Sequence, residues 1–166
     1  MITTLLRLNN LNDEMMHIQK ELNSAVKEVF HQAMINVFLA YNRCNEDVRH
    51  AVLPFDITSQ QFNVLRILRG QHPKPATINL IKARMLDKMC DASRIVDRLV
   101  QKDLVNKNIN AYDKRAVDII ISEKGIQLLK KTDKEIDLSA IISASITVEE
   151  AEQLNVLLNK ITAGKD

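Results

Sequence analysis

The sequence contains few residues of the kinds that build β-rich or disulfide-linked domains. Three of its 166 residues are Gly, three are Pro, none is Trp, and aromatic residues make up only 4% of the chain. So few turn-forming residues favour a mainly helical fold over an all-β fold. Cys44 and Cys90 are too few for a disulfide framework and lack the CxxC spacing of a zinc or redox motif. We therefore expect both thiols to be reduced.

The chain also lacks the motifs of common enzyme and metal-binding classes. It has no GxGxxG or GxxxxGKS/T phosphate-binding loop, and its only glycines are Gly70, Gly125 and Gly164. No nucleophile with a nearby base stands out, so no enzymatic activity is expected. The spacing of the histidines matches no ligand motif, which predicts neither a metal nor another cofactor. These histidines are His17, His31, His50 and His72.

No long apolar run begins the chain. Polar and charged residues interrupt the first stretch, so neither a signal peptide nor a membrane span of about 20 apolar residues is predicted. The interrupting residues are Arg7, Asn9, Asn10, Asn12 and Asp13. A cytoplasmic location is therefore expected.

Charge is distributed unevenly along the sequence. From Thr58 to Gly125 there are 13 Lys or Arg against 7 Asp or Glu, a net charge of +6. The rest of the chain has 10 basic against 14 acidic residues, a net charge of −4. A basic centre is typical of a nucleic-acid surface flanked by helices that do not bind, although a solvated basic face explains it equally well.

The N-terminal part of the sequence predicts one long amphipathic helix. Apolar residues recur there at steps of three and four, with no Gly or Pro between them. They are Met15, Ile18, Leu22, Val26, Val29, Ala33, Val37 and Tyr41. A helix of roughly 30 residues is about 45 Å long, which is more than a small domain needs for its own core. Such a helix usually packs against a partner.

Three shorter helices are predicted in the centre. Thr58 and Gln61 form a capping box, and this helix should end by Gly70, in a left-handed C-terminal conformation before Pro73 and Pro75. Thr77 and Asp87 are plausible N-caps for two further helices that meet at a tight turn. The apolar residues of this region are expected to form a core that supports the surface: Phe62, Val64, Leu65, Ile81, Ile95, Val96 and Leu99.

Two strands and two more helices complete the expected order. Residues 104–109 and the β-branched run 117–121 flank a polar, basic tip, as in a β-hairpin wing. Ser122 is expected to cap a helix that carries Ile126, Leu129 and Ile136. Thr147 and Glu150 form a second capping box before a C-terminal helix.

Residues from Asp56 to Leu129 resemble the MarR (multiple antibiotic resistance regulator) family of winged helix-turn-helix regulators. The resemblance rests on Ile57-Thr58-Ser59-Gln60-Gln61-Phe62-Asn63-Val64-Leu65, Ala92-Ser93-Arg94-Ile95-Val96-Asp97-Arg98-Leu99, Asp113-Lys114-Arg115 and Ile121-Ser122-Glu123-Lys124-Gly125. The chain departs from the family at Asp103, where a Gly usually ends the recognition helix. Because Asp tolerates a left-handed conformation, the same turn is expected at a cost of about 1 kcal/mol or less.

The resemblance implies a mainly α fold with a small β-wing, in which N- and C-terminal dimerisation helices flank the winged helix-turn-helix. Residues 1–166 would form one module, with a DNA-binding lobe at 56–125 and a helical dimerisation region at 10–50 and 126–163. The implied function is a sequence-specific transcription regulator, a repressor, that binds a palindromic operator in double-stranded DNA as a homodimer. A small-molecule effector would release it.

The same resemblance places a recognition helix at about Lys88 to Lys102, with its first half facing the major groove. The candidate contacts on this helix are Lys88, Met89, Asp91, Ser93, Arg94 and Arg98. Asp91 has two open interpretations: it accepts a hydrogen bond from cytosine, or it pairs with a neighbouring cation. In the wing, Arg115 would enter the minor groove, Asp113 would orient the loop, and Lys107 and Lys114 would contact phosphates.

Two alternatives stay open at this point. Cys90 would lie in the first turns of the recognition helix, where a helix N-terminus can lower a thiol pKa, so it is a candidate redox sensor, although free cysteines are more often inert. The chain could also be a winged-helix protein-interaction module without DNA binding. Asp91 and Asp103 favour that alternative, whereas the retained cations Arg94 and Arg115 favour DNA.

Overall fold

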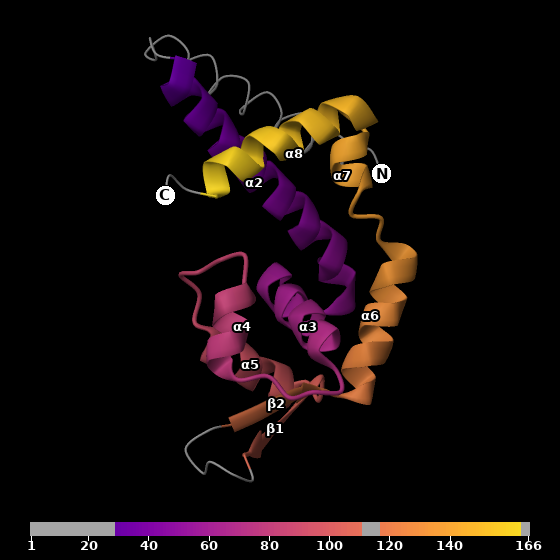
Figure 1. The fold of residues 1–166 in the computed structure, drawn as a ribbon. Coiled ribbons are helices and arrows are strands. Elements are labelled where there is room, and N and C mark those ends of the chain that lie inside the picture. Colours follow the sequence, from indigo (N-terminus) through magenta and orange to yellow (C-terminus); the bar gives the residue numbers. More distant parts are fainter. Residues whose placement is uncertain (1–28, 111–116, 164–166) are drawn as a thin grey trace. The chain divides into compact units, whose positions relative to one another are not determined.

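The computed structural model describes residues 29–110 and 117–163 (Figure 1). These residues divide between two compact units at Arg43, so the first helix begins in one unit and ends in the other. The elements are α2 (Val29–Val52), η1 (Leu53–Phe55), α3 (Ser59–Gln71), α4 (Ile78–Arg84), α5 (Ala92–Gln101), β1 (Val105–Ile109), β2 (Val117–Ile121), α6 (Glu123–Glu135), α7 (Ala140–Ser143) and α8 (Val148–Thr162). The predicted fold class, mainly α with a small β-wing, is confirmed.

Four helix starts lie where the capping residues predicted them. Thr58 and Gln61 form a complete capping box at α3, and Thr147 and Glu150 form another at α8. The Thr77 side chain accepts from the backbone N–H of Leu80 at the start of α4, and Ser122 caps α6 in the same way. These starts are predictable because each cap and its partner lie within three residues.

The end of α3 differs from the prediction. The helix continues through Gly70 to Gln71, and Gly70 does not adopt a left-handed conformation. The C-cap is His72, which has an extended ψ of 135°. Because the residue before a proline disfavours helical geometry, Pro73 ends this helix without help from glycine. The four-residue helix α7 was not predicted at all.

One hydrophobic core holds the second unit together. It contains the predicted residues Phe62, Val64, Leu65, Ile81, Val96 and Leu99, and Ile95 packs against it half-buried. Helix α3 lies at its centre, in contact with α4, α5, α6 and β2 (Figure 1). The core also takes in Val52 at the end of α2 and Leu129 on α6. Its other members lie between helices or on strands, namely Ile57, Ala76, Met85, Leu104, Val105, Ile119 and Ile121.

The two strands form the predicted antiparallel hairpin. Val105 pairs with Ile121 and Ile109 with Val117. On the other side of β2, the backbone of Ala76 exchanges two hydrogen bonds with Ile119, at 2.8 and 2.9 Å. This short bridge ties the start of α4 to the hairpin, so the wing and the central helices are positioned together.

The turn between α5 and β1 forms as expected. Asp103 adopts a left-handed conformation with φ of 58°, and its N–H donates to the carbonyl of Val100. Ser122 connects this turn to α6: its hydroxyl donates to the carbonyl oxygen of Asp103 at 2.7 Å and accepts from the N–H of Gly125 at 3.0 Å. The end of α5 is therefore fixed against the first turn of α6.

Helices α2 and α8 each expose an apolar face. On α2 the exposed residues include Phe30, Met34, Val37 and Tyr41, which are spaced by three or four positions. On α8 Leu154, Leu157 and Ile161 have the same spacing. No helix within residues 29–110 and 117–163 combines the length and the apolar character needed to cross a membrane.

Candidate nucleic-acid interface

Helix α5 presents a polar surface opposite the core. Ala92, Val96 and Leu99 are buried, while Ser93 and Arg94 are exposed. Since these positions follow the 3.6-residue period of a helix, Arg94 lies almost directly opposite the core. The first turns of this helix are therefore free to enter a groove.

The start of α5 lies later in the sequence than predicted. Asp91, not Asp87, is the N-cap, and its carboxylate accepts from the backbone N–H of Arg94 at 3.1 Å. Asp87 instead accepts from the N–H of Met89 at 2.9 Å, within the turn before the helix. The turn extends through Cys90, so Asp91 directly precedes the first helical residue. Its carboxylate is therefore the one that caps the helix. Neither open interpretation of Asp91 anticipated this capping role.

Lys88 and Met89 consequently lie in the turn between α4 and α5. The ammonium group of Lys88 donates to the carbonyl oxygen of Ala83, near the end of α4. Met89 is 94% exposed, and its neighbour Leu86 is also largely exposed. The N–H of Leu86 donates to the Asn63 side chain at 3.2 Å, which fixes the turn against α3. Neither the Lys88 contact nor the Leu86 contact was predicted from the sequence. One signal could have indicated the turn, because Leu86 falls outside the apolar pattern of either helix.

Arg94 and Arg98 line a hollow beside the start of α3. The hollow has a volume of about 260 Å³, and Thr58 and Gln60 form its opposite wall. Among the described residues, neither guanidinium group has a hydrogen-bond or ion-pair partner. Two unpaired cations at the edge of the exposed α5 surface can accept phosphate or carbonyl oxygens.

Lys107 on β1 has a different environment from the one expected. Its ammonium group pairs with the carboxylate of Asp97 on α5, at 2.8 Å. Both side chains are partly exposed, so this ion pair contributes at most about 1 kcal/mol. It nevertheless joins the wing to α5, at a residue that does not line the hollow beside α3. The remaining predicted wing residues, Asp113, Lys114 and Arg115, lie outside the described residues.

The expectation of a lowered pKa at Cys90 is wrong. Burial raises the pKa of the Cys90 thiol, and the nearby carboxylate of Asp87 raises it further. The thiol precedes the N-cap, and it donates to the carbonyl oxygen of Asp87 at 2.9 Å. The surroundings of Cys90 therefore favour the neutral thiol over the thiolate.

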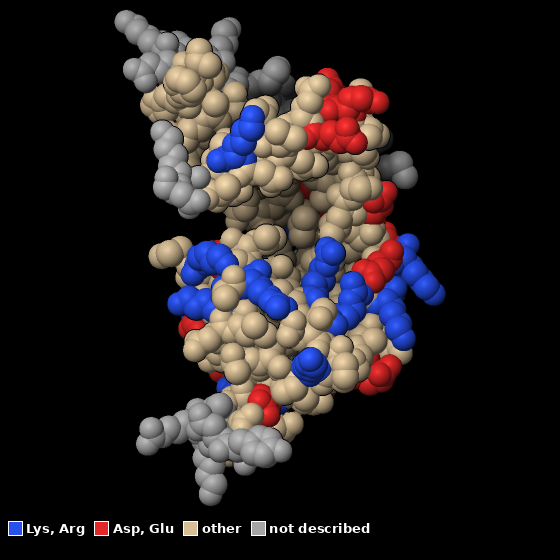
Figure 2. Space-filling model, in the orientation of Figure 1, with Lys and Arg blue, Asp and Glu red and all other residues tan. Residues whose placement is uncertain are grey.

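Basic side chains also gather over other parts of this lobe. Figure 2 shows them over α3, α4 and α6, whereas carboxylates gather over the first turn of α8. Helix α4 ends with Lys82 and Arg84. The basic and acidic residues that are separated along the sequence are therefore also separated on the face that Figure 2 shows.

The arrangement of α3, α4, α5 and the hairpin matches known proteins. Residues 57–117 match the model of the MarR family. Over this segment the chain is similar to MarR-family proteins. The match covers α3, α4, α5, β1 and the first residue of β2.

Solved MarR-family structures share the fold over most of this chain. MarR of Escherichia coli, without ligand, is 23% identical, with a TM-score of 0.65 over 82% of this chain and 98% of that chain. A cysteine-to-serine variant of the same regulator, in complex with operator DNA, is 25% identical, with a TM-score of 0.70 over 81% and 99%. BpsR of Bordetella bronchiseptica is 19% identical, with a TM-score of 0.66 over 79% of this chain and 98% of that chain. The DNA binding of BpsR is regulated by 6-hydroxynicotinic acid.

The capping role of Asp91 gives a testable distinction. Asp91→Ala should lower the free energy of unfolding by about 1 kcal/mol, because the N–H of Arg94 loses its acceptor. Asp91→Asn keeps a capping oxygen and removes the charge, so it should be close to wild type in thermal unfolding. Equal destabilisation by both variants would show that the charge matters and the cap does not.

Proposed function

We propose that the chain is a transcription repressor that binds a palindromic operator in double-stranded DNA as a homodimer. The exposed face of α5 carries this proposal, with Arg94 in its first half and Arg98 one turn further on, neither of them paired with another described residue. A helix of this kind suits the major groove, where side chains can reach base edges. The operator complex of the E. coli relative supports the same use of the fold.

The candidate residues take distinct roles in this proposal. Ser93 and Arg94 face away from the core and would contact bases, together with Met89 in the preceding turn. Lys88 and Arg98 would contact phosphates, which position the helix without reading sequence. Asp91 would act through the cap that it provides to α5.

The wing would contact DNA beside the helix. Arg115 would enter the minor groove, Lys114 would contact phosphate, and Asp113 would orient the loop. Lys107 would act mainly through its ion pair with Asp97, since that pair occupies its ammonium group. DNA phosphates could still recruit Lys107 at small cost, because an exposed pair is weak.

The exposed apolar faces of α2 and α8 support a homodimer. Each face consists of large apolar side chains. Their burial in a dimer would be favourable by about 25 cal/mol per Å² of apolar surface removed from water. A two-fold dimer would place two recognition helices about one DNA turn apart. The same symmetry would make the operator palindromic.

Two residues that favoured the alternative of a protein-interaction module, Asp91 and Asp103, no longer favour it. Asp91 caps α5, and Asp103 forms the turn that follows it. Both carboxylates therefore have local structural roles. Neither needs to be explained by the absence of DNA.

Titration of the protein against fragments of its own genome, at several salt concentrations, tests the proposal. Wild type should select palindromic fragments, with affinity that falls steeply as salt rises. Arg115→Ala should weaken binding by about tenfold or more, as expected for the loss of one specific base contact. Lys130→Ala removes the same charge from the exposed side of α6 and should bind like wild type.

Two results would contradict DNA recognition. One is the absence of any selected fragment. The other is equal affinity of wild type and Arg115→Ala at every salt concentration. Either result would leave the protein-interaction module as the better account.

A further inference from the structure

Two large apolar side chains project into water from the turn between α4 and α5. Leu86 is 82% exposed and Met89 is 94% exposed, and we call these two side chains the apolar pair. Between residues 59 and 110, the other exposed large apolar side chain is Ile109, at the end of β1. The remaining ones among the described residues lie in α2, η1, α7 and α8. Neither the core nor the proposed dimer faces therefore account for the apolar pair.

Local hydrogen bonds hold this turn in place. The N–H of Leu86 donates to the Asn63 side chain on α3 at 3.2 Å, and the N–H of Met89 donates to the carboxylate of Asp87 at 2.9 Å. The thiol of Cys90 donates to the carbonyl oxygen of Asp87, also at 2.9 Å. None of these bonds involves a side chain of the apolar pair. The pair is therefore presented to water by a turn whose shape does not depend on it.

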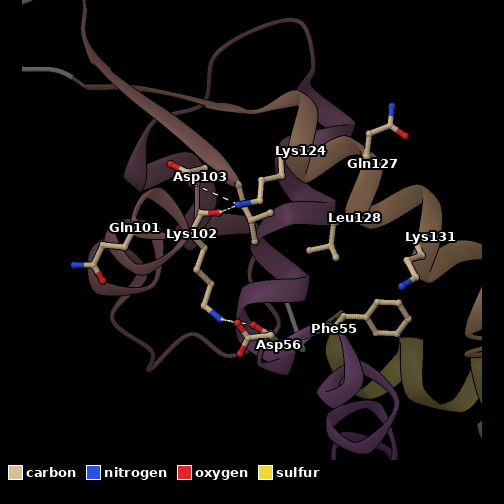
Figure 3. A pocket seen from close by; sticks show the side chains of 10 residues that line it. Phe55, Asp56, Gln101, Lys102, Asp103, Lys124, Gln127, Leu128 and Lys131 are labelled. Carbon is tan, nitrogen blue, oxygen red and sulfur yellow. Dashed lines mark hydrogen bonds and ion pairs between the residues drawn. The ribbon is translucent and has the colours of Figure 1, made fainter.

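Helix α5 is also fixed at its other end. Lys102 pairs with the carboxylate of Asp56 at 2.7 Å, and the ammonium group of Lys124 donates to the carbonyl oxygen of Lys102 at 2.8 Å (Figure 3). With contacts at both ends, α5 and the turn before it form one preformed surface. Such a surface loses little conformational freedom when it binds, so apolar contacts made by the turn would contribute most of their free energy to affinity.

The residues beside the apolar pair suit a nucleic-acid partner. The cations Arg84, at the end of α4, and Lys88, within the turn, are both exposed. The two carboxylates of this segment, Asp87 and Asp91, each accept a backbone N–H. The turn runs directly into the exposed face of α5, so the apolar pair continues the surface that we propose for DNA.

Base edges in the major groove offer one apolar group to such a pair. Thymine carries a C5 methyl group there, whereas the other bases present mainly hydrogen-bond donors and acceptors. Apolar side chains packed against those donors and acceptors would take them out of water without replacing their hydrogen bonds, which costs free energy. The apolar pair can therefore distinguish T·A from other base pairs without making a hydrogen bond.

We propose that the apolar pair binds thymine methyl groups in each operator half-site and so determines part of the sequence specificity. Ser93 and Arg94 on α5 would contact neighbouring base pairs by hydrogen bonds, while Arg84 and Lys88 would contact the flanking phosphates. This inference rests on the proposed function, because it assigns a specificity to the same DNA interface.

Replacement of thymine by deoxyuridine tests the proposal, because it removes the methyl group and leaves every hydrogen-bonding atom of the base unchanged. Each thymine of the operator that wild type selects is replaced in turn, at symmetric positions of both half-sites. Fluorescence anisotropy then measures the affinity. At one or two positions, deoxyuridine should weaken binding about fourfold for each methyl group that loses its apolar contact. Equal affinity for every substituted operator would overturn the proposal.

A double variant, Leu86→Ala with Met89→Ala, tests whether the apolar pair makes these contacts. It should bind the thymine and deoxyuridine operators within about 1.5-fold of each other, because the protein side of the contact is gone. Leu53→Ala shortens an exposed leucine of η1, outside the turn, and should keep the wild-type dependence on the methyl groups. The same dependence in wild type and in the double variant would assign the methyl groups to other residues and overturn the proposal.

Two further results separate the inference from protein stability and from the proposed function. The double variant should melt within about 2 °C of wild type, because its altered side chains are exposed and the hydrogen bonds of the turn remain. A wild type that selects no DNA would overturn the proposed function and this inference together. An operator that is selected, but bound equally with thymine and with deoxyuridine, would overturn this inference alone.

Discussion

Gly125→Ala should lower the melting temperature by about 6–10 °C. A Cβ atom at this position would lie 2.3 Å from the carbonyl oxygen of Leu104 and 2.8 Å from Cγ1 of Ile121. The carbonyl cannot move away easily, because it accepts a hydrogen bond from the N–H of Ser122 at 3.1 Å. Forcing α6 away from the hairpin should cost about 3 kcal/mol. Thermal unfolding followed by circular dichroism measures the change.

Gly70→Ala is the matched control for this substitution. A Cβ atom at Gly70 would meet nothing within 4 Å, and the residue lies inside α3. Alanine is favoured over glycine there by about 1 kcal/mol, so the melting temperature should stay the same or rise slightly. Similar losses in the two variants would mean that the close approach of Gly125 to Leu104 is not what constrains this position.

Leu157→Glu should abolish the proposed dimer and weaken operator binding by about 100-fold or more. Leu157 is 56% exposed and shares a face of α8 with Leu154 and Ile161. If this face is buried in the dimer, an unpaired carboxylate there costs several kcal/mol. Loss of the dimer separates the two half-site interactions and removes their avidity. Sedimentation equilibrium and fluorescence anisotropy with operator DNA measure the two effects.

Asn159→Glu introduces the same charge on the opposite side of α8, two residues further along the helix. This variant should remain dimeric and bind the operator like wild type. A Leu157→Glu protein that is folded, dimeric and active would exclude this face of α8 from the dimer interface. A wild-type protein that sediments as a monomer would exclude the dimer altogether.

Local sequence chemistry predicted most of the secondary structure. The helix starts at Thr58, Thr77, Ser122 and Thr147 depend on caps whose partners lie three residues away, so short motifs suffice. The end of α3 and the start of α5 were misplaced. At each of these points two residues competed for one role, Gly70 with His72 and Asp87 with Asp91, and only backbone geometry decides between them.

The sequence predicted which helix and strands form the candidate interface, but it did not predict which side chains contact each other there. The exposure of Ser93 and Arg94 follows from helical periodicity. The ion pair between Lys107 and Asp97 does not, because it depends on how β1 packs beside α5. The raised pKa of Cys90 also depends on the position of the turn, which places the thiol before the helix and near carboxylates.

The sequence by itself determined the order of the helices and strands, the residues of the core and the MarR-type motifs, because each depends on neighbours or on a repeating pattern. Only the tertiary structure decided that Asp91 caps α5, that Gly125 lies against Leu104, and that the backbone of Ala76 bonds to Ile119. Each of these features depends on the position of a turn or on contacts between segments well separated in the chain. Such positions are set by the packing of the whole core, and no local pattern encodes them.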